Sequence, residues 1–192
     1  ETGFYMADIS GHGAASAMVT AMLKMLFEKY RERLENDEEQ TLRHPAKMLD
    51  RLNQDFCQLD IEKYLTIFYG IIDSTDNSLR FCSGGQFPHP FLNDGEQLIP
   101  VTQHDKPVGL FEGQAFTEHR RELPASFVLF LASDGILELL KKDSAQRRAE
   151  LLAEILRETD CDIETLVNKL AIDEQGELPD DISLLTVSRD WA

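Results

Sequence analysis

Aspartates lie at three places where apolar runs of the sequence begin or end. Asp8 follows the run in FYMADISG, Asp134 follows the run in SFVLFLASDGILE, and Asp180 and Asp181 precede the run in ELPDDISLLTV. Carboxylates at the ends of neighbouring strands point toward a common place. Hard divalent cations such as magnesium and manganese prefer oxygen ligands. The three positions therefore predict a cation site that needs neither histidine nor cysteine.

Each of these acids also has an ordinary structural interpretation. Asp-Gly and Asp-Asp are common in turns, because aspartate accepts hydrogen bonds from nearby backbone and tolerates loop conformations. Glycine follows closely after two of them, at Gly11 and at Gly135, and glycine lets a backbone approach a ligand closely. The recurrence of the pattern at three strand ends favours the metal interpretation.

Other catalytic arrangements are absent from the sequence. No serine lies in a G-x-S-x-G elbow, and no G-x-x-x-x-G-K-[ST] phosphate loop occurs. His12, between Gly11 and Gly13, is a candidate general acid, since histidine titrates near neutral pH. Packing at the start of the next helix is its favoured interpretation, and Ser10 is expected only to cap that helix.

Apolar periodicity predicts the elements that position these residues. Helices are expected from Ala14 to about Lys29 and from Pro45, with a fraying, solvated segment over 31–43 between them. Strands are expected over 4–7, 64–73 and 79–83, near 116–123, over 127–132 and from 181, and further helices over 149–156 and 163–170. Helices, then strands, then helices and a final strand predict an α+β fold in which helices cover sheet faces.

Composition excludes several classes of protein. The 192 residues carry 19 basic and 35 acidic side chains, and the formal net charge of −16 disfavours nucleic-acid binding. The three cysteines, Cys57, Cys82 and Cys161, form no C-x-x-C pair and predict reduced thiols in a cytoplasmic protein. No apolar run approaches the roughly 20 residues that span a bilayer. The start at Glu1, without methionine and directly before an apolar run, predicts a piece of a longer protein.

Six ordered segments resemble motifs of the PPM, or phosphatase 2C-like, metal-dependent serine/threonine phosphatases. They are ADISGHGAASA, YGIID, SGGQFPHPFL, KPVGLF, LASDGILE and PDDISLLTV, and they cover nearly the whole chain. Within the family the sequence is most similar to the bacterial SpoIIE- and RsbU-like branch, found as the output domain of RssB-like response regulators. The resemblance implies a PPM-type sandwich of two antiparallel β-sheets flanked by helices. It further implies one phosphatase domain over residues 1–192, truncated before its first strands and upstream domains.

The resemblance also implies a role for individual residues. Asp8 matches the acid that bridges two manganese or magnesium ions, and Ile9 would offer its backbone carbonyl. Asp134 and Asp180 match the acids that hold the metal on the nucleophile side, so these aspartates would act through metal-bound water. Three neighbours are expected behind the ligands or at the rim: His12, Gly135 and Asp181.

Two functions remain open at this point. The first is a metal-dependent phosphatase that hydrolyses phosphoserine or phosphothreonine on a signalling partner, by resemblance a STAS-type anti-anti-sigma protein. The second is a phosphatase-like module that sequesters such a partner without turnover, because the branch has an acidic Gly-Asp motif before the position of Asp8 that this chain lacks. The three retained aspartates favour the enzyme. The resemblance also implies an upstream receiver or sensor domain and leaves a homodimer open, while the short apolar runs predict no membrane partner.

Overall fold

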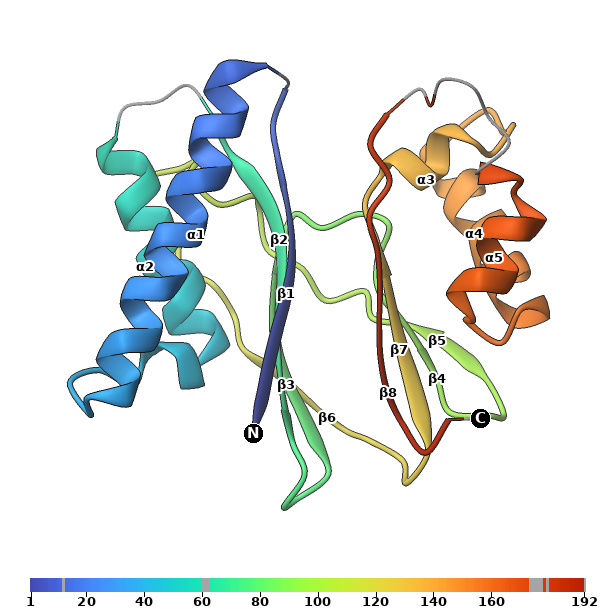
Figure 1. Ribbon diagram of the computed structural model, residues 1–192, viewed down its shortest axis with the longest axis horizontal. Coiled ribbons are helices and arrows are strands. Elements are labelled where there is room, and N and C mark those ends of the chain that lie inside the picture. The colour runs from blue at the N-terminus through green and yellow to red at the C-terminus, as the bar shows by residue number, and fades with distance from the viewer. Residues whose placement is uncertain (12, 60–62, 173–177, 179, 192) are drawn as a thin grey trace. The chain divides into compact units, whose positions relative to one another are not determined.

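The computed structural model describes residues 1–11, 13–59, 63–172, 178 and 180–191 (Figure 1). This part of the chain forms two four-stranded antiparallel sheets accompanied by helices, which confirms the α+β class. The chain divides into two compact units. The first unit comprises Glu1–Gln86 and Gln103–Glu122, and the second comprises Phe87–Thr102 and Leu123–Ala192. The assignment of residues 1–192 to one domain stays a prediction.

The first unit is a sheet with two helices on one face (Figure 1). Its strands, in the order β1-β2-β3-β6, are β1 (Thr2–Ile9), β2 (Leu65–Asp73), β3 (Ser78–Gly84) and β6 (His119–Glu122). Its helices are α1 (Ala14–Glu35), the 3-10 turn η1 (Thr41–Arg43) and α2 (Pro45–Gln58). The starts of α1 and α2 are those that the sequence predicts. Apolar side chains of both helices and of β2 share one core, so this packing fixes the sheet against the helices.

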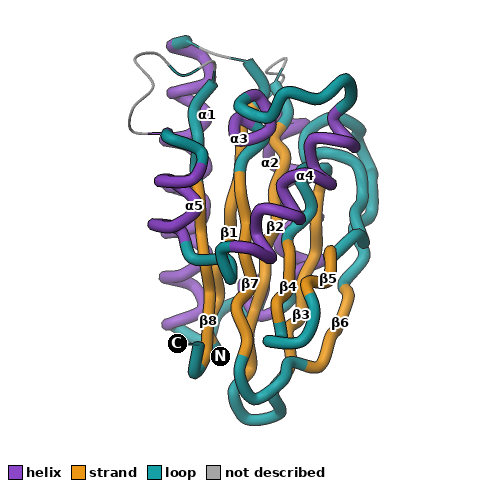
Figure 2. Tube along the Cα trace, turned by 90° about the vertical axis from the view of Figure 1, so that its right-hand side faces the viewer, coloured by secondary structure: helices purple, strands orange, loops and turns teal. Residues whose placement is uncertain are grey.

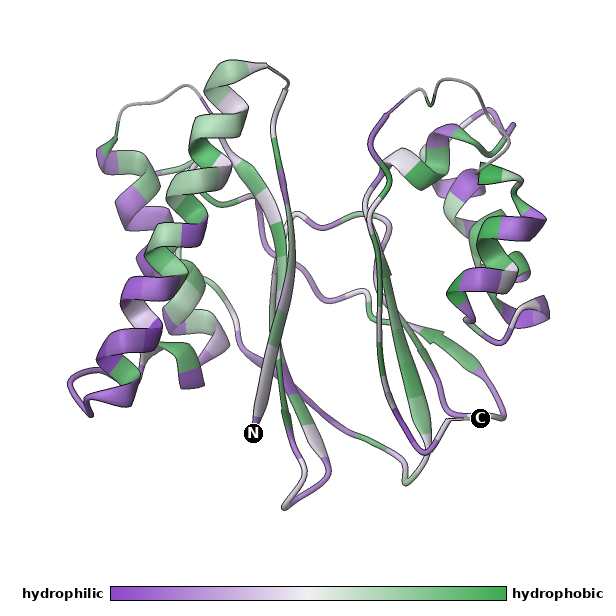
Figure 3. Ribbon diagram, in the orientation of Figure 1, coloured by the Kyte–Doolittle hydropathy of each residue, from purple (hydrophilic) through white to green (hydrophobic). Residues whose placement is uncertain are grey.

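Helix α1 extends past its predicted end and continues to Glu35. Its N-terminal half is hydrophobic and its C-terminal half hydrophilic (Figure 3), which is why the sequence pattern weakens there. Two contacts keep the charged half helical. Arg31 pairs with Glu28 and Glu35, and the buried Tyr30 donates a hydrogen bond to Asp55 of α2. Burial and that hydrogen bond raise the pKa of Tyr30 to about 12.

The second unit is a sheet with three helices on one face (Figure 1). Its strands, in the order β5-β4-β7-β8, are β4 (Phe91–Asn93), β5 (Leu98–Pro100), β7 (Phe127–Ala132) and β8 (Leu184–Arg189). Its helices are α3 (Gly135–Glu138), α4 (Ala145–Glu158) and α5 (Ile163–Lys169). Strand β7 is hydrophobic along its length (Figure 3), and Figure 2 shows it running between β4 and β8. Side chains of all three helices pack with this sheet in a second core.

Strand β6 and helix α3 also differ from the prediction. Strand β6 begins at His119 rather than near Phe116, because the Phe116 amide donates to Asp50 Oδ1 of α2 instead of to a neighbouring strand. Helix α3 is a single short turn after β7 that periodicity cannot reveal over four residues. Among the described residues, no helix is both long enough and apolar enough to cross a membrane.

Candidate functional site

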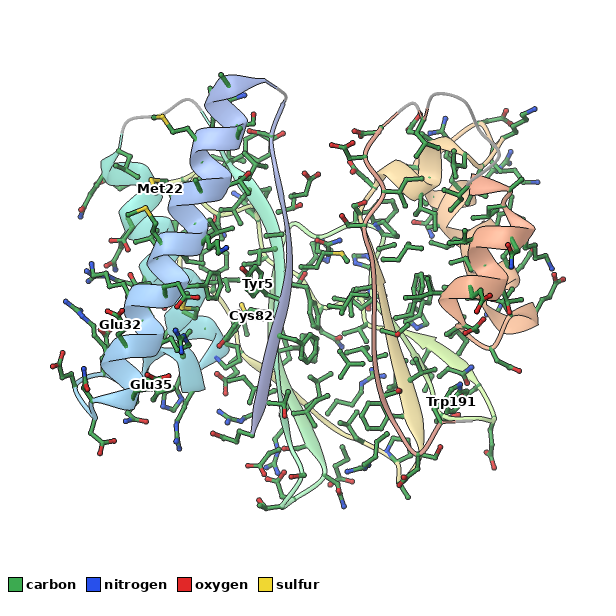
Figure 4. The ribbon with its side chains drawn as sticks, in the orientation of Figure 1. Tyr5, Met22, Glu32, Glu35, Cys82 and Trp191 are labelled. Carbon is green, nitrogen blue, oxygen red and sulfur yellow. The ribbon has the colours of Figure 1, made fainter. Side chains whose placement is uncertain are left out.

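Asp8 lies near the end of β1 and is exposed. Side chains of a strand alternate between the two faces of its sheet. Tyr5 points toward α1 (Figure 4), where its ring stacks on that of Phe27 with the centroids 4.1 Å apart. Asp8 therefore lies on the face of this sheet that points away from α1. The register with β2 sets Asp8 opposite Thr66 and Ile9 opposite Leu65, so the acid stands at the strand end that the sequence predicts.

The turn after β1 is tied to the start of β2. The Ser10 amide donates to the Tyr64 carbonyl at 2.9 Å, and the Tyr64 amide donates to Ser10 Oγ at 3.1 Å. Lys63 Nζ donates to the Ser10 carbonyl at 2.9 Å. At Gly11, φ is +75°, and a Cβ there would lie 2.7 Å from Lys63 Nζ. These bonds hold the backbone that follows Asp8 in one conformation.

The predicted capping role of Ser10 is wrong. Its hydroxyl is used by Tyr64, and Gly13 occupies the N-cap position of α1 without a side-chain cap. His12 lies outside the described residues, so its role at the site stays a prediction.

Asp134 and Asp180 come together in the second unit. Asp134 is exposed, but partial desolvation and the negative charge of Asp180 raise its pKa, because both effects disfavour its ionised form. Asp180 Oδ1 also accepts a hydrogen bond from the Asp181 amide at 2.8 Å, and both aspartates at 180 and 181 are exposed. The junction thus holds two like-charged oxygen donors whose repulsion a bound cation would offset.

A pair of serines positions this junction. The Ser133 amide donates to the Ser183 carbonyl at 2.9 Å, and the Ser183 amide donates to Ser133 Oγ at 2.8 Å. The ladder between β7 and β8 ends just before them, at the pair Ala132 and Leu184. For this reason β8 begins at Leu184. The sequence predicts a start at Asp181, which is three residues too early.

Gly135 allows close packing at the same junction. A Cβ at Gly135 would collide with the Asp181 carbonyl oxygen and would lie 3.4 Å from Asp180 Cβ. Ser133 Oγ donates to that same Asp181 oxygen at 3.2 Å. Gly135 and Asp181 therefore contribute through their backbones, by setting the distance between the segments that carry Asp134 and Asp180.

The donors of the two units suit a hard cation. The candidate ligands are carboxylates and one backbone carbonyl, the oxygen ligands that magnesium and manganese prefer. In the described part of either unit, no three His, Cys, Asp or Glu side chains are grouped as a metal site. Within the second unit, Asp134 and Asp180 form a carboxylate pair. Within the first unit, the predicted ligand Asp8 lies near the end of β1.

Sequence reasoning missed the two serines that organise the second unit. Ser133 directly precedes Asp134, and Ser183 follows Asp181 after one intervening residue. Their signal in the sequence is weak: a small hydroxyl residue close to an acid at the end of an apolar run.

Comparison with known proteins gives a consistent result. A family model described as Stage II sporulation protein E (SpoIIE) matches residues 1–190. No curated protein matches the sequence. Among solved structures, the SiaA-PP2C domain of Pseudomonas aeruginosa is similar with a TM-score of 0.71 and 18% identity, over 96% of this chain and 78% of that chain.

Two further structures extend the likeness. The first contains the PP2C phosphatase domain and a fragment of the regulatory domain of SpoIIE from Bacillus subtilis; its TM-score is 0.71 at 21% identity, over 97% of this chain and 54% of that chain. The chain thus spans about half of that one. The second is the catalytic domain of PstP in complex with 2 manganese ions, with a TM-score of 0.54 at 19% identity, over 98% and 88% of the two chains. These likenesses show that the fold is that of PP2C domains.

Proposed function

The chain belongs to the SpoIIE family, and on that premise we propose that it is a metal-dependent protein serine/threonine phosphatase. The match of residues 1–190 to the family carries the proposal. The PP2C fold supports it, as does the retention of acids at all three predicted strand ends.

We propose that Asp8, Asp134 and Asp180, with the carbonyl of Ile9, hold two manganese or magnesium ions. Support comes from the family, from the oxygen-only donor set and from the like-charged pair at the second-unit junction. The similar structure of PstP is a complex with 2 manganese ions. When bound, two such cations lower the pKa of water toward neutrality and neutralise phosphate oxygens, so that no protein nucleophile is needed.

The residues of the chain have their own parts in this proposal. A net charge of −16 repels a phosphorylated substrate, so the acids must hold cations to reverse the local sign. Ser133 and Gly135 keep Asp134 close to Asp180, and the hydrogen bonds of Ser10 orient the backbone after Asp8. In this proposal the protein's own residues bind the cations and orient the ligands within each unit.

Hydrolysis of p-nitrophenyl phosphate with and without manganese tests the proposal. We expect manganese-dependent turnover that falls on the order of 100-fold or more in Asp8→Asn, Asp134→Asn and Asp180→Asn, because even outer-shell changes at metal sites cost 10- to 100-fold. Asp143→Asn is a matched control, since Asp143 is exposed and its ion pair is with Arg147.

Two results would contradict the proposal at different points. If the protein binds no manganese in calorimetry and releases no phosphate, the phosphatase hypothesis is wrong. The alternative, a phosphatase-like module that sequesters a partner without turnover, would then be favoured. Unchanged rates in Asp8→Asn and Asp180→Asn, in an active protein, would overturn the ligand assignment alone.

We further propose a phosphorylated STAS-type anti-anti-sigma protein as the substrate, within the cytoplasm. Support is the resemblance to the RsbU-like branch, which also implies a receiver or sensor domain upstream, in the arrangement of RssB-like response regulators. Mass spectrometry of such a phosphoprotein after incubation with the chain and manganese should show loss of the phosphate. An intact phosphoprotein beside rapid p-nitrophenyl phosphate hydrolysis would rule out this substrate.

A further inference from the structure

An exposed apolar patch lies in the first unit beside the turn that follows Asp8. Tyr64, Leu110 and Phe111 are 39%, 45% and 46% exposed, and two lysines flank them. The five residues of this Phe111 patch are Lys63, Tyr64, Lys106, Leu110 and Phe111. Single exposed apolar residues are ordinary, but a group of them bordered by charges is typical of a protein-binding surface.

Backbone contacts join the two segments of the patch. Leu65 and Val108 exchange both of their backbone hydrogen bonds, each at 2.9 Å. At Gly109, where φ is +84°, a Cβ would lie 3.4 Å from the Lys63 carbonyl oxygen. Residues 63–64 and 110–111 are therefore neighbours in space although they are far apart in the chain.

Helix α2 holds the patch in place. Asn53 is only 2% exposed; its Oδ1 accepts from the Gly109 amide at 2.7 Å, and its Nδ2 donates to the Phe111 carbonyl at 2.9 Å. Lys106 Nζ lies 4.2 Å from the centre of the Phe111 ring, within cation–π range. The exposed side chains thus stand on an ordered backbone, which lowers the entropy lost when a partner binds.

The patch also contacts the turn that follows the predicted ligand Asp8. Tyr64 and Ser10 exchange hydrogen bonds, and Lys63 Nζ donates to the Ser10 carbonyl. Ser10 is two residues after Asp8. A protein whose phosphate group is bound near Asp8 would therefore reach the Phe111 patch with adjacent residues.

The charges beside the patch indicate which kind of partner binds there. Lys63 and Lys106 place two positive charges beside the patch against one negative charge at Glu112, and so favour an anionic partner, although the chain as a whole carries −16. A second copy of the chain would bring another −16, and that repulsion opposes self-association. A phosphorylated protein substrate with apolar side chains flanked by acidic ones fits both the position and the charge.

Resting on the proposed phosphatase function, we propose that the Phe111 patch binds the phosphorylated protein substrate beside its phosphoserine or phosphothreonine. Apolar side chains of the substrate pack on Tyr64, Leu110 and Phe111. Acidic side chains of the substrate face Lys63 and Lys106. The patch thereby favours protein substrates over small phosphate esters.

The test compares two substrates in Phe111→Ala and Lys106→Ala. Phosphorylated β-casein serves as an acidic phosphoprotein, and p-nitrophenyl phosphate as an ester too small to contact the patch. We expect the KM for phosphocasein to rise about tenfold in Phe111→Ala, as for a central interface aromatic. In Lys106→Ala it should rise about threefold, most clearly at low salt. The kcat values and the KM for p-nitrophenyl phosphate should not change.

Controls separate docking from other roles. Met25→Ala removes an apolar side chain that is 71% exposed on α1, outside the patch, and should leave the KM for both substrates unchanged. Circular dichroism melting verifies that each variant is folded, and Lys106→Ala supplies an independent test if Phe111→Ala is destabilised.

Several results would overturn this inference. One is an unchanged KM for phosphocasein in Phe111→Ala and Lys106→Ala. Another is an equal loss of kcat/KM with phosphocasein and with p-nitrophenyl phosphate. A change of oligomeric state in light scattering for Phe111→Ala would assign the patch to a second copy. If the wild-type protein hydrolyses neither substrate, the phosphatase function itself fails, which is distinct from hydrolysis that is indifferent to the patch.

Discussion

The two units position their acids by different means. In the first unit Asp8 stands on the edge strand β1, and the turn after it is held by hydrogen bonds of Ser10. In the second unit Asp134 and Asp180 are held by backbone packing at Gly135, close enough for the charge of one to raise the pKa of the other. The first unit thus offers one carboxylate beside an ordered turn, and the second offers a repelling pair that gains most from a cation.

Gly135→Ala should break the second-unit junction and has the largest expected effect on stability. The added methyl group would collide with the carbonyl oxygen of Asp181, where backbone meets backbone. We expect a loss of about 3 kcal/mol in the free energy of unfolding, measured by urea denaturation. Gly113→Ala is the control: φ is +70° there and nothing lies within 4 Å, so strain alone should cost about 1 kcal/mol. Equal losses would show that packing at Gly135 is unimportant.

Asn53→Ala tests whether side-chain hydrogen bonds stabilise the first unit, as backbone packing at Gly135 is expected to stabilise the second. It leaves the Gly109 amide and the Phe111 carbonyl without their partner on α2. Because Asn53 is buried, we expect a loss of about 2 kcal/mol in the free energy of unfolding. Gln54→Ala, at an exposed position of the same helix, should be nearly neutral. A similar small loss for Asn53→Ala would mean that packing alone maintains this loop.

The pH dependence of Asp134 should give the smallest effect. Because its pKa is raised above 3.8 in the folded protein, metal-free protein loses stability as the pH rises from about 3.8 through the folded-state pKa. Asp134→Asn removes the repulsion, so metal-free Asp134→Asn should melt at a slightly higher temperature than wild type at pH 7. The difference should shrink as the pH falls below 3.8, because the carboxyl group then becomes protonated in both the folded and the unfolded state.

Melting curves in EDTA between pH 3.5 and 7 measure this effect. Asp143→Asn, an exposed acid paired with Arg147, is the control and should not raise the melting temperature. If Asp134→Asn melts below wild type at pH 7, hydrogen bonding by Asp134 outweighs its repulsion by Asp180. The second unit would then not contain the repelling pair that distinguishes it from the first.

Much of the fold could be predicted from the sequence, because local periodicity records which face of each element is buried. The starts of α1 and α2 and the full extent of β7 are examples. Two of the misses share one cause. The end of α1 depends on Tyr30 bonding to Asp55, and the start of β6 depends on Phe116 bonding to Asp50. Such contacts join distant parts of the chain and leave no trace in a local pattern.

For the site, the sequence by itself determined the residue types: acids at strand ends, with glycines close behind two of them. Only the tertiary structure decided which of these residues meet within a unit. Asp134 lies beside Asp180 because β7 and β8 pair in one register and Ser133 continues that pairing with Ser183 through its side chain. Register is a property of two strands together, so no single stretch of sequence contains it.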